Sequence, residues 1–133
     1  MRPTLPPGLG VRSLVSMRDD LALMSLVREC HPGRPPRSLF YFAAYPTFVI
    51  AEGDGAIVAY TQLCMMPFGG PLMVHGIDLG VHPAHRRQGL ARALVSFRLA
   101  LGAKLGAIGG YGMTEPDNTA MRALFESEGW CLL

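Results

Sequence analysis

The sequence is poor in the residues that mark disulfide-rich and metal-binding proteins. Only 3 of its 133 residues are cysteine, and no C-x-x-C pair or Cys/His pair at metal-ligand spacing occurs. The 4 histidines are scattered along the chain. We therefore expect neither a disulfide framework nor a metal site, and a reducing cytoplasm is the expected compartment.

Charge and long apolar runs are limited as well. Charged residues make up 17% of the chain and the net charge is +2, which does not by itself indicate nucleic acid or an anionic membrane as a partner. The longest apolar stretch, residues 39–51, spans 13 residues and is interrupted by Pro46, whereas a membrane span needs roughly 18 or more. The first ten residues are rich in proline and glycine and lack the apolar core of a secretory signal.

Apolar residues, by contrast, are plentiful enough to build a core. They make up 50% of the chain, which is ordinary for a folded domain. A chain of 133 residues can bury a sizeable core. Because no internal repeat, low-complexity tract or linker occurs, we expect a single domain over residues 1–133.

The first part of the chain predicts a strand followed by helices. Residues 11–15 are strand-like, and Ser16 with Asp19 resembles a capping box that opens a helix. The sequence His31-Pro32-Gly33 is expected to end this helix. Residues 38–45 predict a short second helix before Pro46.

The middle of the chain predicts three antiparallel strands. Residues 47–52 and 56–63 are strand-like and flank Gly53-Asp54-Gly55, which is typical of a hairpin turn. A second turn at residues 66–71 leads to a strand over residues 72–81. In that strand apolar residues at odd positions alternate with small or charged residues at even positions.

The last part returns to helical spacing. Residues 89–102 predict an amphipathic helix, with an apolar stripe formed by Leu90, Leu94, Phe97 and Leu101. Residues 107–112 predict a short buried strand, and Pro116-Asp117-Asn118 opens a final helix that Gly129 closes. The order of elements predicts an α+β fold (mixed α/β) with a βαβ crossover over residues 72–112.

One stretch, residues 77–93, combines a strand, a basic turn and a glycine at the start of a helix. The first N–H groups of a helix have no partner within the helix, and the helix dipole is positive at that end. Gly89 lets the backbone approach a ligand closely, and Arg86 and Arg87 add formal charge. Together these features predict a site for a phosphate-bearing ligand.

The same residues carry a family resemblance. Val81-His82-Pro83 leads into residues 86–91, which match the pattern Arg/Gln-x-x-Gly-x-Gly/Ala, and a second pattern is met by Asn118, Leu124-Phe125 and Gly129-Trp130. In both patterns the chain resembles the GNAT superfamily of N-acetyltransferases. The resemblance implies a twisted, mostly antiparallel sheet flanked by helices. It also implies acetyl-CoA as cosubstrate and direct attack by an amine of a small molecule or peptide.

The resemblance also implies a cofactor site. N–H groups of residues 87–91 would hold the pyrophosphate, the backbone at Leu79 and Val81 would pair with the pantetheine arm like an extra strand, and Asn118 would bind the arm from the other side. The implied cofactor-binding residues are Leu79, Gly80, Val81, Arg86, Arg87, Gln88, Gly89, Leu90, Ala91, Arg92, Asn118 and Phe125.

The catalytic residues are less fully indicated. In many members of this family a tyrosine at the position of Phe125 protonates the departing thiolate, and Phe125 has no hydroxyl. Either water suffices as the proton donor, because a thiol with a pKa of about 8.5 is a tolerable leaving group, or Tyr111 donates the proton instead, or the domain binds the cofactor without efficient turnover.

An amine must also lose a proton when it attacks. Asp78 is the first candidate to accept it, because it is expected to stand between Gly76 and Gly80 on one face with room for a substrate. Glu52 is the second candidate. An N–H near Leu79 is expected to stabilise the oxyanion.

Alternatives to an acetyltransferase differ in class. A non-catalytic CoA-binding or regulatory module is favoured by Phe125, whereas nucleic-acid binding through Arg86, Arg87 and Arg92 is disfavoured because no aromatic residues are interleaved with them. Family members usually continue with two more strands after the second pattern, which are short or missing here. An open sheet edge invites pairing, so a homodimer is expected.

Overall fold

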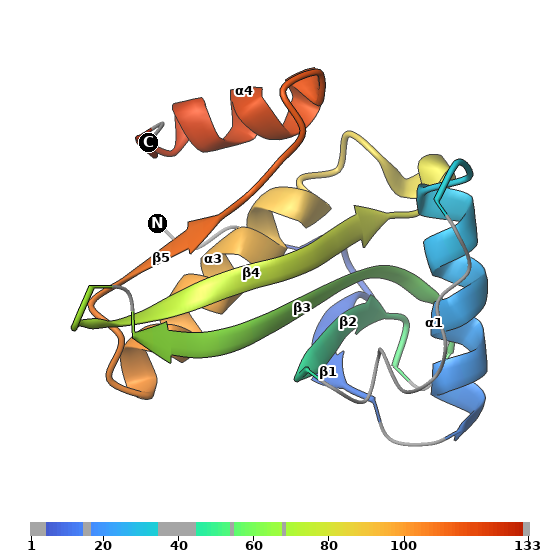
Figure 1. Ribbon diagram of the computed structural model, residues 1–133. Coiled ribbons are helices and arrows are strands. Elements are labelled where there is room, and N and C mark those ends of the chain that lie inside the picture. Colours follow the sequence, from blue (N-terminus) through green and yellow to red (C-terminus); the bar gives the residue numbers. More distant parts are fainter. Residues whose placement is uncertain (1–4, 15–16, 35–44, 54, 68, 132–133) are drawn as a thin grey trace.

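The computed structural model describes residues 5–14, 17–34, 45–53, 55–67 and 69–131. In this part of the chain five strands form one sheet in the order β1-β2-β3-β4-β5 (Figure 1). The strands are β1 (Gly10–Ser13), β2 (Thr47–Ala51), β3 (Ile57–Pro67), β4 (Leu72–Val81) and β5 (Gly109–Gly112). Neighbouring strands are antiparallel except β4 and β5, which are parallel. The predicted α+β fold with a mostly antiparallel sheet is confirmed.

Helices cover both faces of the sheet. The described helices are α1 (Met17–Cys30), the 3-10 helix η1 (Pro83–His85), α3 (Leu90–Lys104) and α4 (Thr119–Ser127). Ser16 and the predicted helix at residues 38–45, apart from Tyr45, lie outside the described residues. None of the described helices is both long and apolar enough to cross a membrane. The described residues also contain no group of three or more His, Cys, Asp or Glu side chains placed to hold a metal ion.

Alternation along β2 separates two halves of the core. Val49 and Ala51 pack with α1, whereas Ile50 packs with α3. Because successive side chains of a strand point to opposite faces, α1 and α3 lie on opposite faces of the sheet. Figure 1 shows α3 behind β3 and β4, and α1 at the right of the view, beside the end of β4 and the start of β3.

A bulge interrupts β4. Gln62 of β3 pairs with Asp78, but the next residue, Leu63, pairs with Gly76, so Ile77 is one residue more than the partner strand accommodates. A bulge of this kind reverses which residues point to which face. The strand itself is confirmed, whereas a single alternation running through its whole length is wrong.

The reversal places the two glycines beside Asp78 on opposite faces. A Cβ at Gly76 would lie 2.0 Å from Nη1 of Arg98 in α3, whereas a Cβ at Gly80 would lie 2.6 Å from the ring of Tyr60 and 3.0 Å from Cys30 of α1. Both spaces are therefore filled by other side chains. The expectation that these glycines leave room for a substrate on the face of Asp78 is wrong.

The last two strands part from each other halfway along β4. They pair only from Met73 with Gly109 to Gly76 with Gly112. Beyond this point β4 continues to Val81, and the chain after β5 turns away toward α4 (Figure 1). We call the parting point, bounded by Gly76 and Gly112, the fork. The predicted βαβ crossover is confirmed, and the fork is the feature that positions the site.

Candidate functional site

The loop between β4 and α3 has an unusual backbone. Arg87 has φ +64° and is the only non-glycine residue with positive φ among those described, and Gly89, the N-cap of α3, has φ +76°. A left-handed conformation costs an ordinary residue roughly 1–2 kcal/mol. Strain of this kind is concentrated at functional sites, and here it lies within the basic turn that the sequence singled out.

This backbone directs a row of N–H groups outward. The N–H groups of residues 87–92 donate to no other described residue, and the first bond of the helix runs from the N–H of Ala93 to the carbonyl of Gly89 at 3.0 Å. Arg86, Arg87, Gln88 and Gly89 are all exposed. A helix N-terminus with free N–H groups and flanking guanidinium groups can bind an anion such as a phosphate.

Arg92 is turned away from this row. Its guanidinium forms an ion pair with Glu128 and donates to Oγ of Ser127 at 3.0 Å. These contacts join the first turn of α3 to the last residues of α4. Of the residues predicted to bind the cofactor, Arg92 therefore has a side chain already engaged in holding two helices together.

The edge of β4 beyond the fork is open. The N–H of His82 donates to the carbonyl of Val58 in β3 at 2.8 Å, and in an antiparallel pair the residues that bond across alternate with those that do not. Leu79 and Val81 consequently direct their N–H and C=O groups away from β3, toward the edge of β4 that β5 does not cover. Gly80, between them, directs its backbone toward β3.

Two of these backbone groups have partners from the same strand or loop. The N–H of Leu79 donates to Oδ1 of Asp78 at 2.9 Å, and the carbonyl of Val81 accepts from Nε of Arg86 at 3.4 Å. The Leu79 N–H, which was expected to stabilise an oxyanion, is thus occupied in this structure. The N–H of Val81 donates to no other described residue.

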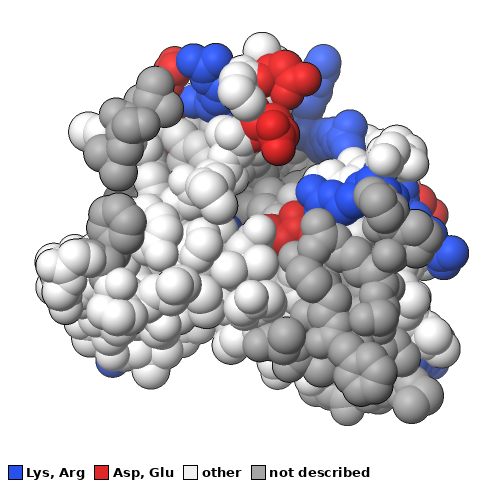
Figure 2. Space-filling model, in the orientation of Figure 1, with Lys and Arg blue, Asp and Glu red and all other residues white. Residues whose placement is uncertain are grey.

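The opposite side of the fork is formed by α4. Oδ1 of Asn118 accepts from the N–H of Met121 at 3.1 Å and caps the helix, as predicted. Phe125 packs against Trp130 with ring centroids 4.8 Å apart. A pocket with a free volume of about 10 Å³ lies at the fork, and its wall includes Gly76, Arg98, Phe125 and Trp130. Figure 2 shows the surface hollowed below α4, where β4 and β5 diverge.

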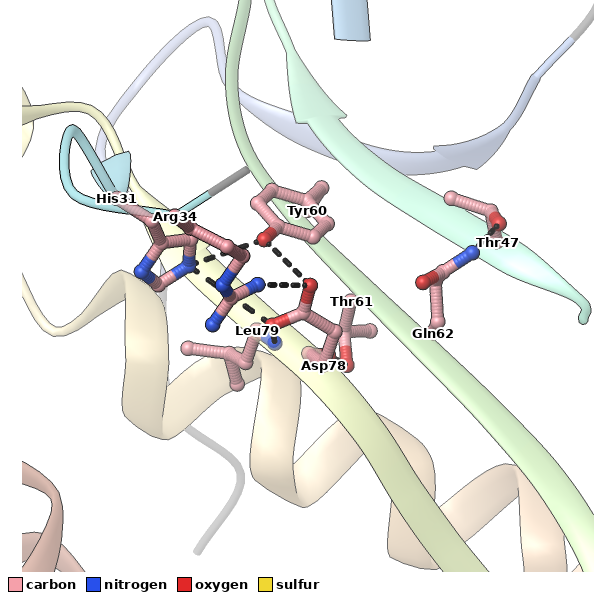
Figure 3. Close-up of polar contacts among 8 residues, drawn as sticks. All are labelled: His31, Arg34, Thr47, Tyr60, Thr61, Gln62, Asp78 and Leu79. Carbon is pink, nitrogen blue, oxygen red and sulfur yellow. Dashed lines mark hydrogen bonds and ion pairs between the residues drawn. The ribbon is translucent and has the colours of Figure 1, made fainter. Parts of the chain in front are cut away.

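Asp78 lies on the α1 side of the sheet, within a polar cluster (Figure 3). Its Oδ2 accepts from Nη1 of Arg34 at 2.8 Å and from the hydroxyl of Tyr60 at 2.9 Å. The Nε2 of His31 lies 3.8 Å from Oδ1. The side chain of Asp78 is only 7% exposed. We call Asp78, Tyr60, His31 and Arg34 the carboxylate cluster.

Hydrogen-bond directions in the cluster follow from Tyr60. Its hydroxyl has one hydrogen, which it donates to Asp78, so the contact of 3.1 Å with Nε2 of His31 requires that nitrogen to donate. Burial, followed by the charge of Asp78 and the bond to it, raises the pKa of Tyr60. The tyrosine therefore stays a neutral donor to the carboxylate.

Sequence reasoning missed three members of this cluster. His31 and Arg34 follow α1, and Tyr60 belongs to β3, so only tertiary packing brings them to Asp78. The spacing of these residues along the sequence therefore does not predict that they contact Asp78. Glu52, the second candidate base, is exposed, and its N–H bonds to Ala56 in the turn after β2.

Tyr111, considered as a proton donor, lies on the face opposite α3. Its ring stacks on His75 at 4.4 Å between centroids, and its hydroxyl contacts Sδ of Met66 at 3.6 Å. The hydroxyl is thereby directed toward Met66 of β3, although Tyr111 and Phe125 both line the pocket at the fork. This placement does not support Tyr111 as a replacement for a hydroxyl at that position.

Comparison with known proteins agrees with this geometry. A family model described as the acetyltransferase (GNAT) family matches residues 18–130. A comparison with curated proteins found no match.

Several solved structures share the fold. The ribosomal-protein-S18-alanine N-acetyltransferase from Escherichia coli is 24% identical, with a TM-score of 0.74 over 91% of this chain and 76% of that chain. An acetyltransferase from Trypanosoma brucei is 23% identical, with a TM-score of 0.75 over 94% of each chain. The aminoglycoside acetyltransferase AAC(6')-Iy, in complex with a bisubstrate analogue, is 16% identical, with a TM-score of 0.77 over 93% of this chain and 91% of that chain.

Proposed function

Because the chain belongs to the GNAT acetyltransferase family, we propose that the open edge of β4 and the first turn of α3 bind acetyl-CoA and that an amine attacks at the fork. The enzyme class predicted from the sequence, an N-acetyltransferase, is the class of this family, and the family uses acetyl-CoA. What is proposed is the assignment of residues. The observation that carries it is the open edge of β4, which leads through the basic loop to the free N–H groups of α3.

The pyrophosphate would bind at the basic loop. N–H groups from Arg87 to Ala91 point outward without partners among the described residues, and the exposed side chains of Arg86, Arg87 and Gln88 lie beside them. Gly89 has no Cβ, and nothing lies within 4 Å of the place where one would be. A phosphate can therefore approach the backbone at Gly89 and Leu90 closely.

The pantetheine arm would run along β4 from Val81 toward the fork. Its amides can pair with the backbone of Val81 and Leu79, as a strand added to an open edge would. Asn118 and Phe125 of α4 would form the other wall of this channel. The amide nitrogen of Asn118 is the group we assign to bonding the arm, because its Oδ1 caps α4.

For Asp78 we propose a narrower role than the sequence predicted. A carboxylate has about four lone-pair sites, and three donors already occupy this one. With 7% of its side chain exposed, Asp78 offers an incoming amine little access. Its charge holds Tyr60 and Arg34, and thereby the end of α1, against β4 on the acceptor side.

Substitution of Asp78 by Asn separates the two roles. A residue that only holds the acceptor side should raise KM for the amine and leave kcat within a fewfold of wild type. Direct proton transfer contributes roughly 10²–10⁴-fold to a rate. A loss of kcat of that size in Asp78→Asn, with KM unchanged, would restore Asp78 as the base.

The acceptor is proposed to be an amine of a small molecule or a peptide. The similar folds include proteins described as an aminoglycoside acetyltransferase and a ribosomal-protein alanine N-acetyltransferase, so both classes should be tested. A thiol-release assay with aminoglycosides and with peptides bearing a free N-terminal alanine compares them. Release of CoA with neither class, from protein that binds CoA, would favour a binding module.

Binding of CoA tests the cofactor site directly. Gly89→Ala and Gly106→Ala introduce a similar backbone strain, because the two glycines have φ +76° and +97° and an empty space around the Cβ position. Only Gly89 lies at the proposed phosphate site, whereas Gly106 follows the opposite end of α3. Calorimetry should show at least a tenfold loss of CoA affinity in Gly89→Ala and none in Gly106→Ala. Equal losses would contradict the site.

We also propose a homodimer in the cytoplasm. β5 is the last strand at its side of the described sheet, and an edge strand can pair with a second copy. All three cysteines are free, which suits a reducing compartment. A monomer by light scattering at micromolar concentration would contradict the dimer.

A further inference from the structure

Arg98 is a cation in the apolar interior between α3 and the sheet. It is 7% exposed and lies among the buried residues of α3, next to Leu94, Val95 and Gly102. Its Nη1 occupies the space that a side chain at position 76 would fill, because a Cβ on Gly76 would lie only 2.0 Å away. The guanidinium is therefore seated directly against β4 at the fork.

This guanidinium has no counter-charge in contact. Within the described part of the chain it forms no hydrogen bond and no ion pair. Burial lowers the pKa of Arg98 to about 10, and the charge of Asp78 offsets this only in part. The group nevertheless remains protonated near neutral pH, and a buried unpaired charge is costly to a fold. A site that keeps such a cation is suited to receive an anion.

The space in front of Arg98 is the pocket at the fork. Its walls include Gly76 from β4, Phe125 from α4 and Trp130, which follows α4. A free volume of about 10 Å³ admits little more than one atom the size of a water oxygen or a sulfur. By size, the pocket therefore suits a single atom better than a bulky group.

The proposed path of the pantetheine arm ends at this pocket. From Val81 to Gly76 the strand spans about 16 Å, at roughly 3.3 Å per residue. The arm consists of pantoyl, β-alanyl and cysteamine units, and about twelve bonds separate its phosphate oxygen from the sulfur at its far end, a reach of about 14 Å when extended. An arm that starts at the first turn of α3 and follows the open edge thus brings its sulfur toward the fork.

We propose that Arg98 stabilises the thiolate of CoA when the acetyl group is transferred. This inference rests on the proposed CoA site. The amine nitrogen forms a bond to the acetyl carbon and gives up one proton to water, while the carbon–sulfur bond breaks and its electron pair stays on sulfur. Sulfur leaves as an anion, and the guanidinium lowers the energy of that charge before a proton from water neutralises it.

Of the side chains next to Arg98, those of Phe125, Tyr111 and His75 are not cations that could stabilise the thiolate. Phe125 has no ionisable group, and the hydroxyl of Tyr111 is directed toward Met66 on the other face of the sheet. His75 belongs to β4, and its side chain lies on the face of the sheet opposite Arg98. Burial, followed by the charge of Arg98, lowers the pKa of His75. At neutral pH His75 is therefore uncharged, and Arg98 is the cation that lines the pocket.

The test compares CoA with desulfo-CoA, which lacks the thiol. Both ligands are titrated by calorimetry into wild type, Arg98→Met, Arg98→Lys and Lys104→Met, at about pH 7 and about pH 9.5, on either side of the ordinary thiol pKa of about 8.5. Lys104→Met is the matched control, because Lys104 is an exposed cation in the last turn of α3. The groups around Arg98 that titrate or carry charge are His75 and Asp78 on β4 and Tyr111 on β5. The α4 residues in the pocket wall carry no charge.

A stabilised thiolate makes CoA bind better than desulfo-CoA as pH rises. A lowering of the bound thiol's pKa by one unit gives a tenfold preference at high pH. We expect at least this preference in wild type and Lys104→Met, a smaller one in Arg98→Lys and none in Arg98→Met. Arg98→Met should fold, because an apolar side chain of similar length replaces a buried charge.

Four results would overturn the inference. A preference for CoA that does not rise with pH in wild type excludes thiolate stabilisation, and so does an equal rise in Arg98→Met. If Arg98→Met does not fold, ultraviolet difference absorbance of the wild-type CoA complex still reports the pKa of the bound thiol, and a value at or above about 8.5 contradicts the proposal. If wild type binds neither ligand, the proposed CoA site fails and the inference fails with it.

Discussion

The hydroxyl of Tyr60 provides a sharp test of the carboxylate cluster. Tyr60→Phe removes this hydroxyl and leaves the ring in place, so it deletes the bond of 2.9 Å to Oδ2 of Asp78 and the contact of 3.1 Å with Nε2 of His31. A hydrogen bond to a charged group contributes about 1.5–3 kcal/mol. Tyr60 is 0% exposed, so water cannot replace the lost donor. His31 is partly exposed and can turn to solvent, and we therefore expect a loss of about 2 kcal/mol in the free energy of unfolding.

Asp78→Asn completes a double-mutant cycle with Tyr60→Phe. The substitution keeps the shape of the side chain but presents one NH₂ group to three donors. The side chain of Arg34 is 30% exposed, so part of the lost ion pair is recovered by water, and we expect a loss of about 2–3 kcal/mol. Because the two residues share a bond, the double variant should be less destabilised than the sum by about 1 kcal/mol or more.

Urea unfolding followed by circular dichroism measures all four proteins. Asp20→Asn serves as the matched control, because Asp20 lies in the first turn of the same helix, α1, that the cluster holds, and a change within about 0.5 kcal/mol is expected there. If Tyr60→Phe also stays within that range, or if the two effects add without coupling, then the cluster does not join α1 to β4 as described.

Three further predictions concern single positions. Burial raises the pKa of Cys30 from 9.0 to about 11, so the folded state holds a proton that the unfolded chain releases above pH 9. The free energy of unfolding should therefore fall between pH 9 and 11 by up to about 3 kcal/mol more in wild type than in Cys30→Ala, measured by urea unfolding. Gly76→Ala should cost about 1–3 kcal/mol of stability by overpacking against Arg98, and Arg98→Met should recover part of that cost in the double variant. Asn118→Ala should lose about 1 kcal/mol with the cap, whereas Asn118→Asp should keep the cap and lose only CoA affinity, about fivefold by calorimetry.

Much of the fold could be predicted from the sequence because patterns within short segments indicate most of its helices, strands and turns. The hairpin after β2, the strand β4 and the helix that begins after Gly89 all follow from periodicity and turn residues within short windows. The loop at residues 86–89 could also be predicted, because a glycine between a basic turn and an apolar helical stripe has few other uses. Asn118 as the cap of α4 belongs to the same class of local pattern.

The acceptor side could not be predicted in the same way. No residue type in β4 marks the bulge at Ile77, yet the bulge exchanges the faces on either side of it, so simple alternation places Gly76 and Gly80 on one face. Tyr60 reaches Asp78 only through the register of β3, which depends on that bulge. Arg98 did leave a trace, since it stands four residues after Leu94 within the buried stripe, where an apolar residue would be expected.

Hydrogen exchange of individual backbone amides, with and without saturating CoA, tests most directly whether β4 and α3 form the cofactor site. The N–H groups of Val81, Gly89, Leu90 and Ala91 have no partner among the described residues, so they should exchange fast in the free protein. CoA should protect these four amides while leaving those of β1 unchanged. If CoA binds and these amides remain unprotected, the ligand does not lie along the open edge of β4.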